Sequence, residues 1–203
     1  MNIWGHFKTI TKHKILVAKG CFRLGLYYQG IMHDMSKYSP VEFIPGIKYY
    51  KGTESPNNTE RKKYGVSMAW LHHKGRNKHH FEYWLDYSLD RSNIGYVGMK
   101  IPKCYMAEMF VDRVSAGKIY NGASFQQTDP LDYFTKGIGG TIMHAASREY
   151  LTMLLTMYAK DGDEATFEYL KLDLQEDMSG YDDISPFDFS SEFHLQEENI
   201  SSI

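Results

Sequence analysis

Apolar side chains recur at every third or fourth position through most of this chain, and no segment combines strict apolar–polar alternation with hairpin turn residues. A period of about 3.6 residues is typical of helices that bury one face, whereas a strand requires a period of two. Residues 141–160 form the most apolar of these segments, and their broad apolar coverage indicates a helix deep in the core. The sequence therefore predicts an all-α protein with negligible strand content.

Capping residues place the helix boundaries. Ser39 is predicted to cap a helix in which Glu42 completes a capping box. Asn77 is predicted to cap the helix that follows it, and Gly20 is predicted to end the first helix. The predicted loops are 51–58 and 91–100, and the predicted helices are 3–19, 24–35, 40–50, 60–74, 78–89, 102–119, 129–137, 141–160 and a last one from Asp163 to Leu174.

The size and cysteine content indicate one soluble domain. A chain of 203 residues is expected to form a single domain and to bury its core without disulfides or a structural metal. Cys21 and Cys104 provide neither a disulfide framework nor the paired thiols of a zinc cage, which favours a reducing cytoplasm. The sequence has no apolar run of about 18 residues and no secretory signal, so no membrane partner is expected.

Charge divides the chain into a basic body and an acidic tail. The last basic residue is Lys171, so residues 1–171 carry 23 basic and 16 acidic side chains, a net charge of +7. We predict a helical domain over residues 1–174 and an acidic tail over 175–203. The tail is interpreted either as a solvated, flexible terminus or as a segment that folds back over the basic surface. A basic body is compatible with phosphate-bearing ligands.

Histidines are grouped in the sequence as His33-Asp34, His72-His73 and His79-His80. Imidazole and carboxylate ligands suit first-row divalent metals, and the absence of a thiol pair argues against a structural zinc cage. The adjacent side chains of His33 and Asp34 are expected to reach one metal ion. Lys37 lies one turn after His33 and would face the same way, where it could contact an anionic oxygen.

Two more candidate ligands, His13 and Asp112, lie in helical segments of their own. His13 is predicted to face inward between Ile10 and Val17, either as a hydrogen-bonded core residue or as a ligand. Asp112 interrupts an apolar run, and burying a carboxylate there is costly unless it is paired or bound to a metal. Its alternative partner is the neighbouring Arg113.

The order of these residues, His13, then His33-Asp34, then Asp112, with HD-x-x-K at residues 33–37, resembles the ligand order of the HD-domain phosphohydrolase superfamily. Within it, HDMSKYSPVEF and HHKGRNKHHFEYW resemble motifs of a bacterial and phage family without an established activity. The resemblance covers residues 10–120. It implies a compact, single-domain helical bundle of the HD type, with these four side chains on a metal and Lys37 at a substrate phosphate.

The remaining histidines bear on the number of metals. Superfamily members with two metals recruit extra histidines between the HD pair and the last Asp, and His73 and His80 are the favoured candidates here. Neighbours on a helix diverge by about 100°, so one member of each His-His pair is expected to face inward. The other members, His72 and His79, are held in reserve as ligands. With Arg76 they are expected to form a positive rim that contacts substrate.

The resemblance favours a metal-dependent phosphohydrolase acting on a nucleotide or another small phosphate ester. Asp34 and Lys37 would be its catalytic residues, and one or two divalent ions its cofactors, with Mn, Fe, Mg, Co, Ni and Zn all open. The alternative is a non-catalytic metal-binding module for regulation or ligand sensing, and a di-iron oxygenase is a minor option. No glycine-rich phosphate loop, Ser-His-Asp motif or nucleic-acid fold signature occurs, so a nucleic-acid partner is not expected.

Overall fold

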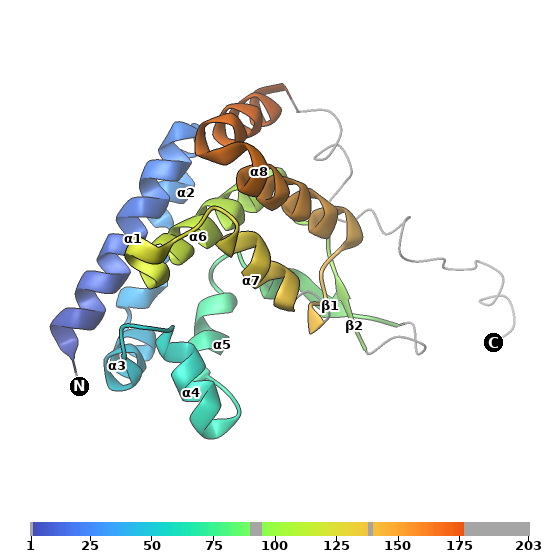
Figure 1. Cartoon of the computed structure of the whole chain (residues 1–203). Helices are drawn as coiled ribbons and strands as arrows, with labels where there is room; N and C mark the ends of the chain where they lie inside the picture. The colour runs from blue at the N-terminus through green and yellow to red at the C-terminus, as the bar shows by residue number, and fades with distance from the viewer. Residues whose placement is uncertain (1, 90–94, 138–139, 177–203) are drawn as a thin grey trace, which may run out of the picture.

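The computed structural model describes residues 2–89, 95–137 and 140–176, and this part of the chain is mostly helical (Figure 1). The all-α prediction is therefore confirmed. The elements are α1 (Ile3–Arg23), α2 (Tyr27–Met32), α3 (Pro40–Tyr49), α4 (Pro56–Tyr64), α5 (Met68–Lys74), β1 (Leu85–Tyr87), β2 (Tyr96–Gly98), α6 (Lys103–Asn121), α7 (Asp129–Gly137) and α8 (Ala145–Glu176), with short 3₁₀ turns at Met35–Tyr38, Phe81–Trp84 and Gly122–Ser124.

Helix α6 is the centre of the core and packs against both α1 and α8. Its Phe110 ring is fully buried and lies 5.8 Å, between ring centroids, from both Tyr158 and Phe167 of α8. Helix α1 approaches α6 closely at Gly20, where an added Cβ would lie 2.5 Å from Val111 Cγ1. Gly20 therefore serves close packing inside α1, and the prediction that it ends the helix is wrong.

The predicted helix over residues 78–89 is wrong. Its place is taken by turns, a 3₁₀ turn and strand β1, which pairs antiparallel with β2 in the register Leu85 with Gly98. The side chain of Trp84 donates from Nε1 to the backbone oxygen of Lys78 (2.7 Å), which closes the turn on itself. The aromatic residues here suit a short pleated hairpin as well as a helix, so local preference does not decide between them. Strand β2 also falls within the predicted 91–100 loop.

Two predicted helices have different boundaries in the structure. The 60–74 helix is divided into α4 and α5 because Gly65 adopts φ 77° and ends α4, after which Ser67 caps α5 by accepting from the Trp70 N–H (3.1 Å). Helix α4 begins at Pro56, inside the predicted loop. Both changes follow from turn and cap residues that end one helix and begin the next within a few positions.

The helix predicted over 141–160 begins too early, and its predicted end lies close to a kink in the structure. Helix α8 starts at Ala145, because the His144 ring accepts the Ala146 N–H (3.2 Å) and so caps it. The element is kinked at Gly162, which has a non-helical backbone (φ 86°, ψ −174°), and a second helical segment follows it to Glu176. The predicted last helix from Asp163 is therefore confirmed as this second segment, and the Asp163 side chain also pairs with Arg23.

The predicted tail, residues 175–203, lies outside the described residues except for its first two, which extend α8. None of the helices in the described ranges has the length and apolar character that crossing a membrane requires.

Candidate metal centre

His33 and Asp34 lie in a sharp turn after α2, so the helix predicted over 24–35 ends early at Met32. Asp34 has φ 54°, and it is the one non-glycine residue with positive φ in the described part of the chain. Lys14 of α1 holds this turn, since its Nζ donates to the backbone oxygens of Ile31 (2.5 Å) and His33 (2.8 Å). Sparsely populated backbone conformations of this kind persist where the surroundings enforce them. The turn directs two adjacent side chains inward, each only 2% exposed.

The first candidate subsite consists of His13 from α1, Asp112 from α6, and the turn residues His33 and Asp34, whose ligand atoms lie within 4.8 Å of one another. His13 Nε2 lies 2.9 Å from Asp112 Oδ1 and 3.8 Å from Asp34 Oδ2. His33 Nε2 lies 3.3 Å from Asp34 Oδ2 and 3.5 Å from Asp112 Oδ1. Ligands about 2.1 Å from one ion are about 3.0–3.4 Å apart in octahedral or tetrahedral geometry. The donor spacing therefore fits one divalent ion.

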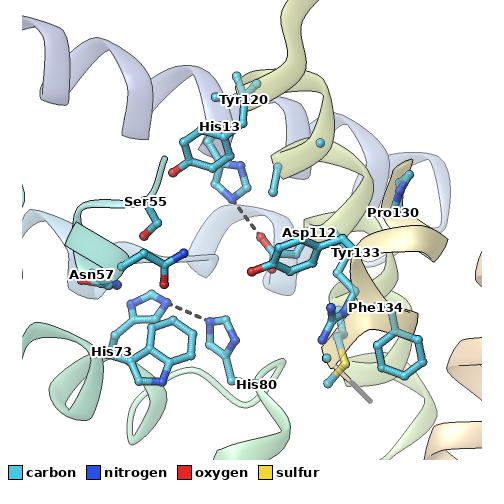
Figure 2. Close-up of a pocket in the computed structure, with 18 of the residues that line it drawn as sticks. His13, Ser55, Asn57, His73, His80, Asp112, Tyr120, Pro130, Tyr133 and Phe134 are labelled. Atoms are coloured by element: carbon cyan, nitrogen blue, oxygen red, sulfur yellow. Dashed lines mark hydrogen bonds and ion pairs between the residues drawn. The ribbon is translucent and has the colours of Figure 1, made fainter. Parts of the chain in front are cut away.

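The second candidate subsite consists of Asp34, His73, His79 and His80. The Oδ1 atom of Asp34 lies 3.2 Å from His73 Nε2 and 3.5 Å from His79 Nε2. His73 Nε2 is 2.8 Å from His80 Nε2, the contact drawn in Figure 2. Both members of the His79-His80 pair take part, which contradicts the expectation that one of them faces away. The reason is that these residues lie in a turn, where the angular spacing of a helix does not apply.

Asp34 joins the two subsites through its two oxygens, Oδ2 in the first and Oδ1 in the second. Both oxygens are buried, and within the described residues neither has a well-aligned hydrogen bond. Their close contacts are instead with groups such as the Lys37 Nζ, 2.5 Å from Oδ2. The buried Nε2 of His79 likewise has no hydrogen-bond partner in this part of the chain. Buried polar atoms normally have hydrogen-bond partners, so ligand atoms that have only ion-pair contacts fit a centre that binds metal.

Glu108 of α6 orients histidines of both subsites, and it is not among the site residues predicted from the sequence. Its Oε1 lies 2.8 Å from His33 Nδ1 and 3.0 Å from His79 Nδ1. An ionised carboxylate only accepts hydrogen bonds, so each Nδ1 donates and each Nε2 faces the centre as a ligand. The signal in the sequence is its position, one turn before Asp112 on the same face of an apolar helix.

Glu42 of α3 performs the same task for the second subsite. It accepts from His73 Nδ1 (2.8 Å) and from His72 Nδ1 (2.7 Å). The predicted capping box is wrong, because Ser39 makes no side-chain cap and Glu42 is buried, only 6% exposed. Contrary to the prediction, Asn77 does not cap a following helix; its Nδ2 instead donates to the His73 backbone oxygen (2.8 Å) in the last turn of the preceding helix α5.

The charges of the centre offset the cost of burying them. Burial would raise the pKa of Asp34, but the nearby His33 and Lys37 charges hold it well below its ordinary value. Burial would lower the pKa of His33, but Asp34 and two further carboxylates raise it well above its ordinary value. A metal at Nε2 must replace that proton, so metal affinity should increase with pH. For His80, burial and the neighbouring His79 and His73 both act to lower the pKa.

An open pocket of about 790 Å³ lies over both subsites (Figure 2). Its volume is in the range of about 300–1000 Å³ typical of small-molecule sites. The ligand side chains at its floor are His13, His73, His79, His80 and Asp112. The cationic side chains in its lining are Lys37, Arg61 and Arg113. The lining also contains the carboxylates Glu82, Asp112 and Asp129, so side chains of both charges line the pocket.

The structure brings some predicted substrate-contacting residues to this pocket and leaves others away from it. Lys37 and His79 line it, although His79 belongs to the second subsite rather than to a rim. His72 and Arg76 are not among the lining residues. The His72 ring turns to Glu42, and Arg76 is exposed in the turn after α5, where it donates to the His72 backbone oxygen (3.3 Å). The arginines that line the pocket are instead Arg61 and Arg113.

Replacing Glu108 with Gln should weaken metal binding at both subsites. A neutral amide lacks the negative charge of the carboxylate and accepts the Nδ1 protons of His33 and His79 more weakly, and loss of such partners costs roughly 10- to 100-fold in metal affinity. Titration of metal-free protein with Mn²⁺ or Zn²⁺ measures the effect. The control is Glu149→Gln, which removes an exposed carboxylate of α8. Loss of affinity at one subsite alone would contradict a shared orienting role.

Comparison with known sequences identifies one family, described as "Family of unknown function (DUF5662)", whose profile matches residues 2–157. The matched region contains every candidate ligand, together with Glu42 and Glu108. No curated protein and no solved structure matches the chain. The match covers more than half of the 203 residues, so this chain belongs to the DUF5662 family of unknown function.

Proposed function

We propose that this protein is a metal-dependent phosphohydrolase of the HD type, acting on a nucleotide or another small phosphate ester. One observation carries the proposal: two sets of imidazole and carboxylate donors share Asp34 at the floor of an open pocket, and the Lys37 ammonium group lies beside them. A site that only stabilised the fold would have no need of an open pocket or a neighbouring cation. The resemblance of the His13, His33-Asp34, Asp112 order to the HD superfamily agrees with this function.

The donor set suits two divalent ions of the first transition row. It contains five imidazoles and two carboxylates and no thiol, which favours Mn, Fe, Co, Ni or Zn and admits Mg least well. Bound ions of this kind polarise a phosphoryl oxygen and lower the pKa of a coordinated water. His13, His33 and Asp112 would hold one ion, His73, His79 and His80 the other, and Asp34 both.

The chain's own groups would bind and neutralise the phosphoryl group. Burial would lower the pKa of Lys37, but the Asp34 carboxylate raises it, so the ammonium group keeps its charge at neutral pH. From the pocket wall it would donate to an oxygen of the reacting phosphate, where negative charge increases in the transition state. The low pKa of Asp34 makes it a weak base and favours its role as the shared ligand over that of proton acceptor.

The proposal is tested by a screen of phosphate esters and nucleotides with protein loaded with Mn, Mg, Co or Ni, using phosphate release as the readout. Replacing Lys37 with Ala should lower kcat/KM roughly 100- to 1000-fold while both metals remain bound, since loss of one charged donor to the phosphate has this magnitude. Lys8→Ala, an exposed lysine of α1 away from the pocket, serves as the control.

Two outcomes would contradict this function. Hydrolysis unaffected by Lys37→Ala would exclude the proposed role of the lysine. Full metal occupancy without hydrolysis of any ester would favour the alternative, a metal-binding module that senses a ligand. Elemental analysis and circular dichroism of each variant show whether a loss of activity reflects lost metal or lost structure.

A further inference from the structure

Arg113 follows the ligand Asp112 on α6 and lines the same pocket. Its guanidinium lies over the Phe134 ring of α7, with 5.0 Å between its central carbon and the ring centroid. Its Nε is buried and has no hydrogen-bond partner among the described residues. Leaving this Nε buried without a hydrogen bond is costly, and the nearby Asp112 and Glu82 carboxylates act on the guanidinium charge without a hydrogen bond or ion pair to it among the described contacts.

The obvious protein partner, Glu82, does not satisfy Arg113. Glu82 also lines the pocket, and its buried Oε2 likewise has no hydrogen-bond partner in the described ranges. Asp112 faces the first subsite, where it contacts His13 at 2.9 Å. Two polar groups of opposite charge that face one pocket without bonding each other are available to a ligand.

The direction of Arg113 separates it from the phosphoryl group at the metal centre. Successive residues of a helix diverge by about 100°, so Arg113 points away from the subsite that Asp112 faces. It points to α7, and Figure 2 shows Phe134 of this helix to the right of Asp112, with the His73–His80 pair to the left. The reacting phosphoryl group already has Lys37 as its cation. Arg113 is therefore placed for a second group of the same ligand.

We propose that Arg113 binds a second anionic group, a phosphate or a carboxylate, so that the substrate is a small phosphate ester with two separated negative groups. This inference rests on the proposed phosphohydrolase function, because the first group is the one bound at the metal centre. The planar guanidinium suits either group, since it donates two parallel hydrogen bonds to phosphate or carboxylate oxygens. The Phe134 ring keeps water from one face of the guanidinium and holds it in place.

Binding of phosphonates that cannot be hydrolysed tests the proposal without requiring activity. Calorimetry on protein saturated with Mn²⁺ compares phenylphosphonate with its 3- and 4-carboxylated derivatives and with the 1,3- and 1,4-phenylene bisphosphonates. At least one ligand with two anionic groups should bind roughly 10- to 100-fold more tightly than phenylphosphonate, as expected for a hydrogen-bonded charge pair. The carboxylate and bisphosphonate arms show which anion is preferred.

Replacing Arg113 with Met should abolish this preference and leave the affinity for phenylphosphonate unchanged. Arg113→Lys keeps the charge without the planar fork and should retain part of the preference; it also serves if the Met variant does not fold. Arg76→Met, an exposed arginine outside the pocket, is the matched control. Circular dichroism and metal content are checked for each variant.

Three results would overturn the proposal. Equal weakening of phenylphosphonate and the doubly anionic ligands in Arg113→Met would place the arginine on the reacting phosphoryl group. A preference that appears in Glu82→Gln but not in the natural protein would show that Arg113 pairs with Glu82. If neither the natural protein nor Glu82→Gln binds the doubly anionic ligands more tightly than phenylphosphonate, the pocket has no second anion site. A preference found in a protein that hydrolyses no ester would instead sink the proposed hydrolase function and leave the binding site standing.

Discussion

Replacing Asp34 with Ala should leave the purified protein without tightly bound metal at either subsite. Asp34 is common to both donor sets and contributes a different oxygen to each. Its removal reduces each set to three side chains and brings the positive Lys37, otherwise 2.5 Å from the Asp34 Oδ2, into an uncompensated position beside the centre. Both the lost ligand and this repulsion act against a divalent cation, so the loss should be complete rather than partial.

Elemental analysis after gel filtration measures the result, with Asp112→Ala as the matched variant. Asp112 belongs to the first subsite alone, so its loss should lower the ratio of metal to protein from near two to near one. Asp132→Ala, an exposed carboxylate of α7, should keep the full content. Full metal content in Asp34→Ala would place the metal elsewhere. A ratio of metal to protein of one in the natural protein, unchanged when His73 or His80 is replaced, would show that the second subsite does not bind metal.

Removing the metal should lower the melting temperature of the protein by at least about 10 °C. A ligand present at a thousandfold excess over its Kd stabilises the folded state by about 4 kcal/mol per site if the unfolded chain does not bind it. For a domain of this size, 1 kcal/mol corresponds to roughly 2–4 °C, so each occupied subsite is worth roughly 8–16 °C. The effect is large because the ligands come from α1, α5, α6 and two turns, which bound metal ties together.

Thermal unfolding followed by circular dichroism, with and without a chelator, gives this shift. Asp34→Ala should melt at the same temperature in both conditions, which separates loss of metal from direct effects of the chelator. Adding Mn²⁺ or Zn²⁺ back to the chelated natural protein should restore the higher value. A melting temperature that does not change when two bound ions are removed would show that the centre does not stabilise the fold.

Local apolar character was enough to predict several helices. The helices predicted over 3–19 and 102–119 are confirmed within α1 and α6, because α1 has apolar residues spaced along one face and α6 is apolar enough to be buried on most of its sides. His13 lies in the first of these helices and Asp112 in the second, and the structure brings both side chains close to His33 and Asp34. Their roles as ligands stay predictions until a metal is measured.

The contacts of the remaining polar residues depend on how the helices pack together. Glu42 satisfies a capping pattern within four residues, yet its carboxylate bonds His72 and His73, some thirty positions away. Glu108 resembles any acid in a helix until α6 packs beside the turn that holds His33. Contacts between such distant positions are set by how helices pack, and local preference carries no information about them.

The segment from Asn77 to Tyr87 is the clearest case in which local sequence preference does not predict the conformation. Its residues are compatible with a helix, and only pairing with β2 and the turn closed by Trp84 select the other conformation. That conformation brings both His79 and His80 to the donor set of Asp34 and His73. The sequence thus determined which residues are available to bind a metal, and long-range packing decided which of their atoms meet.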